Sequence, residues 1–503
     1  MKKMFAEQPR PFFMIFMLEI WERFGYYTVQ GILALFFIRQ LGLSEQQAFY
    51  TFGAFSALVY GMVAIGGYLG DKVLGTKRTI LLGLITLTTG YGMLTFSDQH
   101  TVFYALGLIC VANGLFKANP PNLLAKCYNE NDHRLHGGFT LYYMSINLGS
   151  TFSLLVGPNI AAKYGYPYAF SLSFIGLALG IVNYIYQYHV VADINTPADE
   201  RKIGMLSWGL IVAGIVGATF GSAYLLQHVS LAKTLAWCLT AVIVAIFFYY
   251  TLQEKGLTRM RMLIAFVLMV EAIVFFTLYM QMPTSMNLFA VANVHSSIFG
   301  YQFDAQSYQA LNPIWIIVLS PVLAYCYRAI QHRHINFSIP YKFSVGMIAC
   351  GVAFLTLYLA RFFHDGQGMV SPFWLIASYF FQCVGELLVS ALGVAMVAEL
   401  VPVHIAGFVM GVWYLTSTVA GFTGAAVASM AAIPEGVAHG IPSLMIYTSV
   451  FAKIGLVTVS LGVIMYALSP VLNKYMALPV LSKPEKEDFT LKMVDVADPA
   501  VDV

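Results

Sequence analysis

The chain has 503 residues, of which 59% are hydrophobic and only 10% are charged, and its formal net charge is +3. Soluble globular proteins carry about 25% charged residues, so this composition excludes an ordinary soluble protein. The six cysteines show no metal-binding or disulfide spacing, and there is no phosphate-binding glycine loop, so we expect no metal ion, no cofactor and no direct use of ATP.

Apolar runs recur along the chain and predict an all-α membrane protein with about 14 spans, because a helix needs about 20 apolar residues to cross a bilayer. In chain order, the predicted spans are residues 12–38, 47–70, 78–97, 102–125, 138–162, 166–189, 204–227, 231–252, 262–290, 308–328, 341–363, 372–399, 405–432 and 444–469. The start of the chain has Lys2 and Lys3 but no small-residue cleavage site, so we interpret the first run as a retained span.

Lysine and arginine are distributed unevenly between the predicted loops. If the chain starts inside, the loops and tail on that side hold about 20 of these residues, whereas the opposite loops hold only Arg39, Lys163, Lys233 and Arg361. Because cytoplasmic loops are enriched in Lys and Arg, we expect a multi-pass protein of the bacterial inner membrane with both termini in the cytoplasm.

The first span carries three charged residues, Glu19, Glu22 and Arg23. Residues four apart stack on a helix, so Glu19 and Arg23 should be neighbours, and Tyr26 extends the same broad face. A charge in the middle of a membrane costs about 2.5–3.5 kcal/mol on insertion scales, so such residues face a cavity or the protein interior. The cluster predicts either a working site or an ion-pair network that only fixes helix packing, and we favour the working site.

Four further charges lie at membrane depth in later spans, namely Lys117, Glu271, Glu386 and Lys453. Lys117 could neutralise the excess acid of the first span if the fourth span packs nearby, and Glu386 has no cation within one helical turn. The sequence leaves the role of Glu271 open, and the long stem of Lys453 favours snorkelling to the membrane surface.

Uncharged polar residues accompany these charges in the spans and are Tyr60, Asn147, Asn312 and Ser390. Each one alone is more simply interpreted as a hydrogen bond between helices. The histidines fall in loops or near span ends, so proton chemistry at membrane depth should depend on carboxylates.

Several motifs resemble the proton-dependent oligopeptide transporters of the major facilitator superfamily. The run EIWERFGYY from Glu19 to Tyr27 resembles the family's first-helix signature, and YYMSINLGS from Tyr142 to Ser150 resembles a second one. The loop GGYLGDKVLGTKR, which starts at Gly66, is similar to the superfamily's loop motif, and FKANP at residues 116–120 and GEL at 385–387 also fit. Within the family, the chain resembles the di- and tripeptide permeases of enterobacteria.

This resemblance implies a major facilitator fold with 12 core transmembrane helices in two six-helix bundles and two extra helices between them. The corresponding divisions are an N-terminal bundle (1–190), a linker with two inserted helices (191–258), a C-terminal bundle (259–470) and a cytoplasmic tail (471–503).

The resemblance also implies a proton-coupled symporter that imports dipeptides and tripeptides and is not an enzyme. We expect it to work as a monomer, with peptides, protons and membrane lipids as its partners and no nucleic acid. Proton coupling is implied for Glu19, Glu22, Arg23 and Lys117. The implied substrate-binding residues are Tyr26, Tyr27, Tyr60, Lys117, Asn147, Asn312, Glu386, Ser390 and Trp413.

The chain departs from the family at an outer pair of gating charges. Many members have a basic residue where Gln30 stands and an acid where Met280 or Gln281 stands, so this chain should lack that salt bridge. The alternatives left open are a drug or sugar carrier of the same superfamily, a channel, and an intramembrane enzyme, for which we find no nucleophile–base or metal arrangement.

Overall fold

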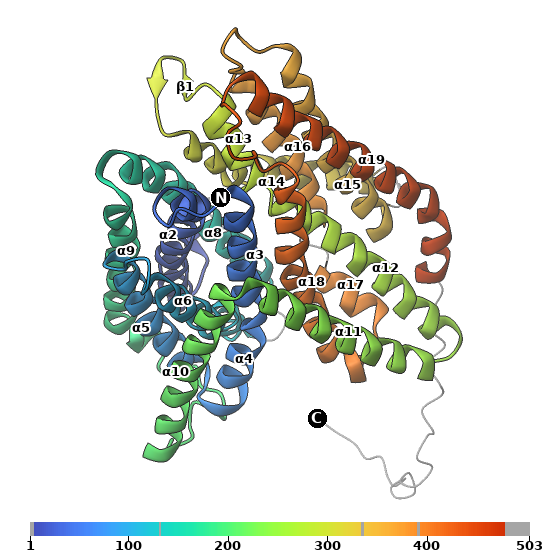
Figure 1. Cartoon of the computed structure of the whole chain (residues 1–503). Helices are drawn as coiled ribbons and strands as arrows, with labels where there is room; N and C mark the ends of the chain where they lie inside the picture. The colour runs from blue at the N-terminus through green and yellow to red at the C-terminus, as the bar shows by residue number, and fades with distance from the viewer. Residues whose placement is uncertain (1–4, 130–131, 333–336, 390–392, 478–503) are drawn as a thin grey trace, which may run out of the picture.

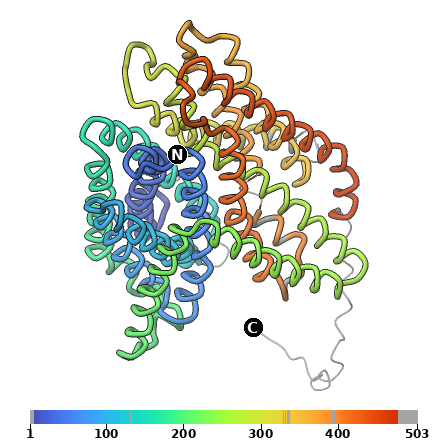
Figure 2. The backbone as a smooth tube through the Cα atoms, in the orientation of Figure 1, coloured from blue at the N-terminus to red at the C-terminus, as the bar shows by residue number. Residues whose placement is uncertain are grey.

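The computed structural model describes residues 5–129, 132–332, 337–389 and 393–477, and these residues are almost entirely helical. Within those ranges, the only two-stranded sheet is a short hairpin of β1 (Ser297–Ile298) and β2 (Tyr301–Gln302). The helices form two groups that lie side by side and can be followed in Figures 1 and 2.

The first group contains the helices that precede residue 190. They are α2 (Arg10–Arg39), α3 (Glu45–Gly61), α4 (Val63–Tyr68), α5 (Thr76–Thr95), α6 (Val102–Lys117), α7 (Asn119–Ala125), α8 (Arg134–Tyr164) and α9 (Tyr166–Tyr186), with a π-helical turn at Leu69–Val73. Helix α2 packs against α8 and α9, and α5 packs against α6 and α9. Helix α3 starts at a capping box, in which Ser44 and Gln47 satisfy each other's backbone N–H groups.

Two long helices follow, α10 (Met205–Gln227) and α11 (Val229–Gln253). Only 17% and 11% of their most apolar segments are buried, so these helices expose apolar surface that suits contact with lipid. Helix α10 packs on α6 and α3 of the first group, whereas α11 crosses to α18 (Figure 1).

The second group follows residue 255. It consists of α12 (Gly256–Tyr279), α13 (Ser285–Asn293), a 3₁₀ turn η3 (Ala305–Ala310), α14 (Leu311–His332), α15 (Ile339–Leu359), a 3₁₀ turn at Ala360–Phe362, α16 (Phe373–Val389), α17 (Gly393–Leu400), α18 (Val403–Ser429) and α19 (Ile441–Ala477). Its main packing pairs are α15 with α19, α15 with α16, and α12 with α18.

Helix occupies every one of the predicted spans, but several spans contain a break. The fourth span divides into α6 and α7 at Ala118, because Pro120 and Pro121 lack the N–H groups that would continue the hydrogen bonds of α6. Among the described residues, ten helices are long and apolar enough to cross a membrane. The first helix is not among them because Glu22 and Arg23 lower its hydropathy.

The two groups meet near one end of the molecule, which we call the α2–α3 end because the turn between these helices forms it. Here α3 packs on α18, and a Cβ atom added at Gly53 would lie 2.4 Å from the backbone oxygen of Gly421. Glu45 accepts a hydrogen bond of 2.8 Å from the backbone N–H of Ile433. Glycine at position 53 therefore permits the close contact that closes this end.

Candidate functional site

The three charges of α2 form one buried cluster, and Tyr142 of α8 completes it. Arg23 Nε lies 3.0 Å from Glu19 Oε1 and also forms an ion pair with Glu22. Tyr142 donates a hydrogen bond of 2.7 Å to Glu19 Oε2. Glycine at position 149 lets α8 approach α2, because a Cβ atom there would lie 2.6 Å from the backbone oxygen of Ile20.

The two carboxylates of the cluster differ in their partners. Glu19 has both the guanidinium and the tyrosine hydroxyl as neighbours. Glu22 is 0% exposed, and neither of its carboxylate oxygens has an aligned hydrogen-bond donor among the described residues. The Glu22 carboxylate is therefore stabilised by the charge of Arg23, which it shares with Glu19, and less by directed bonds.

Lys117 lies at the end of α6, directly before the break that Pro120 causes. Its Nζ is 3.7 Å from the centroid of the Tyr60 ring and 6.0 Å from that of Tyr26. No ion pair of Lys117 occurs within the part of the chain that the structure describes. The ammonium group therefore rests on tyrosine rings beside the acid cluster and retains donors for an anionic ligand.

In the second group, Glu386 of α16 is buried next to Asn312 of α14. The amide nitrogen of Asn312 donates a hydrogen bond of 2.7 Å to Glu386 Oε2. Glycine at position 385 allows α16 to approach α15, since a Cβ atom there would lie 2.7 Å from the backbone oxygen of Gly346. Glu386 is 8% exposed, and its carboxylate accepts from a neutral donor on a neighbouring helix.

A small cavity connects the two groups. It is lined by Tyr27 and Gln30 from α2 and by Tyr279 and Asn312 from the second group, and its volume is about 20 Å³. That volume holds about one water molecule and no peptide, so the structure is closed on this side of the site.

The remaining predicted residues lie in different surroundings. The rings of Tyr26 and Tyr27 meet edge to face at 5.4 Å. The amide of Asn147 donates to the backbone oxygen of Tyr143 in its own helix, at 2.8 Å. Trp413 on α18 packs against the ring of Phe276, with centroids 6.2 Å apart. Ser390 lies outside the described residues.

Two charges that the sequence left without a role remain apart from these clusters. Glu271 on α12 is 6% exposed, and its carboxylate has no hydrogen-bond partner among the described residues. Lys453 on α19 is exposed.

Neutral amides join the groups near the α2–α3 end, where the sequence lacks the family's charge pair. Gln309 donates a hydrogen bond of 2.8 Å to the backbone oxygen of Gly31, and Asn159 donates one of 3.0 Å to Ser307 Oγ. Gln281 instead donates to the backbone oxygen of Gly424 within the second group, at 3.0 Å. Neither Gln309 nor Asn159 was predicted from the sequence to take part in the site. Each lies within four residues of a proline, Pro313 or Pro158, and such a position at a possible helix bend could have drawn attention to them.

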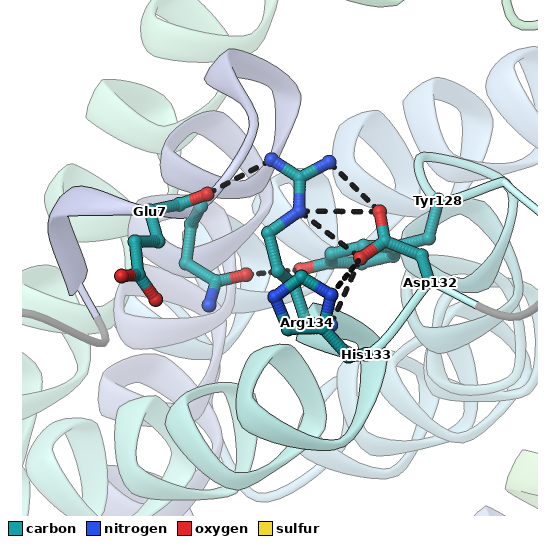
Figure 3. A network of polar contacts seen from close by, with 6 residues as sticks. Glu7, Tyr128, Asp132, His133 and Arg134 are labelled. Carbon is teal, nitrogen blue, oxygen red and sulfur yellow. Dashed lines mark hydrogen bonds and ion pairs between the residues drawn. The ribbon is translucent and has the colours of Figure 1, made fainter.

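At the opposite end, the loop before α8 holds the N-terminal segment (Figure 3). Arg134 donates to the Asp132 carboxylate at 2.7 Å and to the backbone oxygen of Glu7 at 3.0 Å. Tyr128 donates a hydrogen bond of 2.6 Å to Gln8 Oε1. We call this end the α7–α8 end.

Comparison with known proteins identifies the family of the chain. A model of the POT family matches residues 77–450. The dipeptide and tripeptide permease B of Photorhabdus asymbiotica is 50% identical over 473 residues, which cover 93% of this chain and 97% of the relative. The permease of the same name from Salmonella typhimurium is 48% identical over 478 residues, covering 94% and 97%.

Solved structures agree with this assignment. A bacterial homologue of the human drug peptide transporters PepT1 and PepT2 has a TM-score of 0.83 at 33% identity, covering 92% of this chain and 98% of its own. Tetrameric PepTSo2 also has a TM-score of 0.83 at 33% identity, covering 92% and 99%. The chain therefore belongs to the POT family and is a multi-span membrane protein with the major facilitator fold.

Proposed function

We propose that this protein is a proton-coupled symporter that imports dipeptides and tripeptides across the bacterial inner membrane by alternating access. The observation that carries the proposal is the presence of two buried polar sites, one in each helix group, whose neighbours Tyr27 and Asn312 meet where the groups face each other. The names of the permease relatives support the substrate class.

A peptide of two or three residues has a cationic amine and an anionic carboxylate, and the number of residues sets their separation, at about 3.5 Å per residue in an extended chain. In our proposal, Lys117 binds the carboxylate, and Glu386 with Asn312 binds the amine. Tyr26, Tyr27, Tyr60, Asn147, Ser390 and Trp413 complete the substrate site. Recognition of the two charged ends, and not of the side chains, would explain acceptance of many peptides, since every such peptide carries both charged ends.

The acid cluster supplies the proposed proton site. Two carboxylates share one guanidinium, and Glu22 lacks the hydroxyl donor that Glu19 receives from Tyr142. We therefore assign proton uptake first to Glu22 and secondarily to Glu19, with Arg23 and Lys117 setting the local charge. One charge that crosses a potential of 100 mV supplies about 2.3 kcal/mol for accumulation of the peptide.

The proposed working unit is one chain with both termini in the cytoplasm. It comprises an N-terminal bundle (1–190), a linker with two inserted helices (191–258), a C-terminal bundle (259–470) and a tail (471–503). The exposed surfaces of α10 and α11 favour their assignment as the two extra helices. With this orientation the closed α2–α3 end faces outward. Because both polar sites lie within a single chain, we propose that the monomer is sufficient for transport.

Uptake into proteoliposomes tests this function. Purified protein should accumulate a labelled dipeptide when the outside is made acidic, and unlabelled dipeptides and tripeptides should compete whereas free amino acids should not. A drug or sugar carrier of the same superfamily would show no competition by peptides, and a channel would show no saturation. Absence of proton-driven peptide accumulation by folded protein contradicts the proposal.

A further inference from the structure

A pocket of about 700 Å³ lies outside the candidate site, near the α2–α3 end. Its walls come from the starts of α3 and α6 and from the turn between α10 and α11, including Tyr50, Phe103 and Leu226. Proton coupling and peptide binding as proposed above use none of these residues.

The polar part of this pocket suits an anion. Lys233, in the first turns of α11, is exposed, and its Nζ lies 5.4 Å from the centroid of the Tyr50 ring. Gln47 uses its side-chain oxygen to accept from the backbone N–H of Ser44, which leaves its amide NH₂ group as a donor. The residues that line the pocket include no Asp or Glu. An anionic group at Lys233 therefore meets no repulsion from the pocket walls.

A second pocket, of about 380 Å³, lies farther along α6 and α10, and the side chains that line it are apolar. It is bounded by Met62 and Ile65, by Val111 and Leu115 of α6, and by Gly214 of α10, and no side chain in its lining carries a charge or a hydrogen-bonding group.

The spacing between the two pockets matches the depth of one membrane leaflet. On α6 the lining moves from Phe103 to Val111 and Leu115, which at 1.5 Å per residue is about 12–18 Å along the helix. On the antiparallel α10 it moves by a similar distance, from Leu226 back to Gly214. Half of a hydrocarbon core of about 30 Å is about 15 Å. The two pockets thus place a lysine and an apolar hollow about one leaflet depth apart along the same two helices.

We propose that the two pockets form the ends of one lipid crevice along α10, which binds one anionic glycerophospholipid with its phosphate at Lys233 and an acyl chain along Gly214. The lipid-facing character of α10 and α11 leaves the crevice open to the bilayer, which supplies this ligand.

The head of the site is tested with delipidated, detergent-purified protein and native mass spectrometry. Phosphatidylglycerol should bind more tightly than phosphatidylcholine, and Lys233→Ala should weaken phosphatidylglycerol binding about fivefold, the effect of about 1 kcal/mol for one Lys near a charged membrane surface. Lys163→Ala is the matched control, because Lys163 is also exposed and lies 5.2 Å from the Tyr164 ring centroid but does not line the pocket. Equal effects of the two substitutions, or equal affinity for the two lipids, overturn the proposal.

The apolar part is tested by filling it from α10. Cβ atoms added at Gly214 or Gly217 meet no atom within 4 Å, so both positions accept a larger side chain without a clash at its base. Gly214 lines the crevice and Gly217 does not. Gly214→Leu should therefore lose the bound lipid, and Gly217→Leu should retain it. Retention by both variants contradicts the proposal, as does displacement of the lipid by millimolar inorganic phosphate alone, which would identify a simple anion pocket. Monodisperse elution of each variant establishes that it is folded.

Discussion

The charges of α2 could be predicted from the sequence because they share one helix. The i, i+4 spacing of Glu19 and Arg23 alone places them together, and the structure has them 3.0 Å apart. The role of Tyr142 as a donor to Glu19 could not be predicted, because it depends on the register between α2 and α8. That register depends on close packing at Gly149, and no local pattern encodes it.

The first prediction concerns Glu22. One net charge moved across 100 mV sustains a peptide concentration ratio of about 50, since 2.3 kcal/mol corresponds to that factor. Glu22→Gln should reduce the ratio to about one while retaining downhill exchange of peptide. The measurement compares accumulation and exchange of one labelled dipeptide in proteoliposomes. Glu19→Gln should cause the smaller loss, and a Glu22→Gln protein that still concentrates peptide would refute the assignment.

The second prediction concerns the donor that Glu386 receives from Asn312. Hydrogen bonds to charged groups contribute about 1.5–3 kcal/mol, so Asn312→Ala should raise the apparent KM for a dipeptide by about 10-fold or more. Cys383→Ala is the control, because its thiol also contacts Asn312 but bears no charge. We expect the control to stay within about twofold of the unaltered protein. A KM for Asn312→Ala equal to that of the control would exclude this role.

Whole helices were more predictable than the breaks within them. Hydropathy located the helical segments, because a segment that is long and apolar enough to cross a membrane satisfies its backbone groups as a helix. The Asn119-Pro120-Pro121 run explains why α6 ends at Lys117. The break between α12 and α13 lies at Met280–Thr284, and proline at position 283 is its only local signal in the described chain. The hydrogen bond from Gln281 to α18 also stabilises this break, and it could not be predicted because it joins helices far apart in the chain.

The third prediction tests the contact between α2 and α8. Gly149→Ala should lower the melting temperature, because overpacking of a close contact costs about 1–3 kcal/mol. Gly221→Ala on α10 should not, since a Cβ atom there meets nothing within 4 Å and alanine favours helix. Thermal unfolding in detergent compares the variants. A melting temperature that stays constant or rises for Gly149→Ala would contradict the close packing.

The fourth prediction concerns pH and the loop that holds the N-terminal segment (Figure 3). Hydrogen bonds from Arg134 lower the pKa of the Asp132 carboxyl to about 2. Because this folded-state pKa lies below the unfolded value of about 3.9, the stabilisation is present above about pH 4 and is lost as the pH falls toward 2. The melting temperatures of the unaltered protein and of Asp132→Asn should differ at neutral pH and converge below about pH 3. Glu435→Gln, at an exposed position in another loop, controls for a general charge effect. A difference between the Asp132→Asn and unaltered proteins that does not change with pH would contradict this account.

For the whole molecule, the two groups are joined near the α2–α3 end by neutral contacts. The backbone N–H of Asp304 donates to Asn159 Oδ1 at 2.8 Å, and Asn159 in turn donates to Ser307. Since Gln30 replaces the basic residue of many relatives, closure here depends on amides and on the close approach of Gly53 to Gly421. These amide contacts could not be predicted from the sequence, because the amides come from helix ends far apart in the chain.

The fifth prediction tests whether this end must open for transport. Asn159 and Ser307 belong to different groups, and their side chains are 3.0 Å apart, so cysteines at both positions should be linked by oxidation or by a short bifunctional thiol reagent. In a background without the six native cysteines, the linked protein should lose peptide uptake and regain it when the link is reduced. Cysteines at Thr277 and Thr423 are the control, because these hydroxyl groups are also in contact but lie on α12 and α18 of one group. Alternating access requires relative motion of the two groups, whereas helices inside one group can move together. Uptake that continues after complete linkage of positions 159 and 307 would show that this contact does not have to open, and it would exclude the proposed opening of the α2–α3 end as a step in transport.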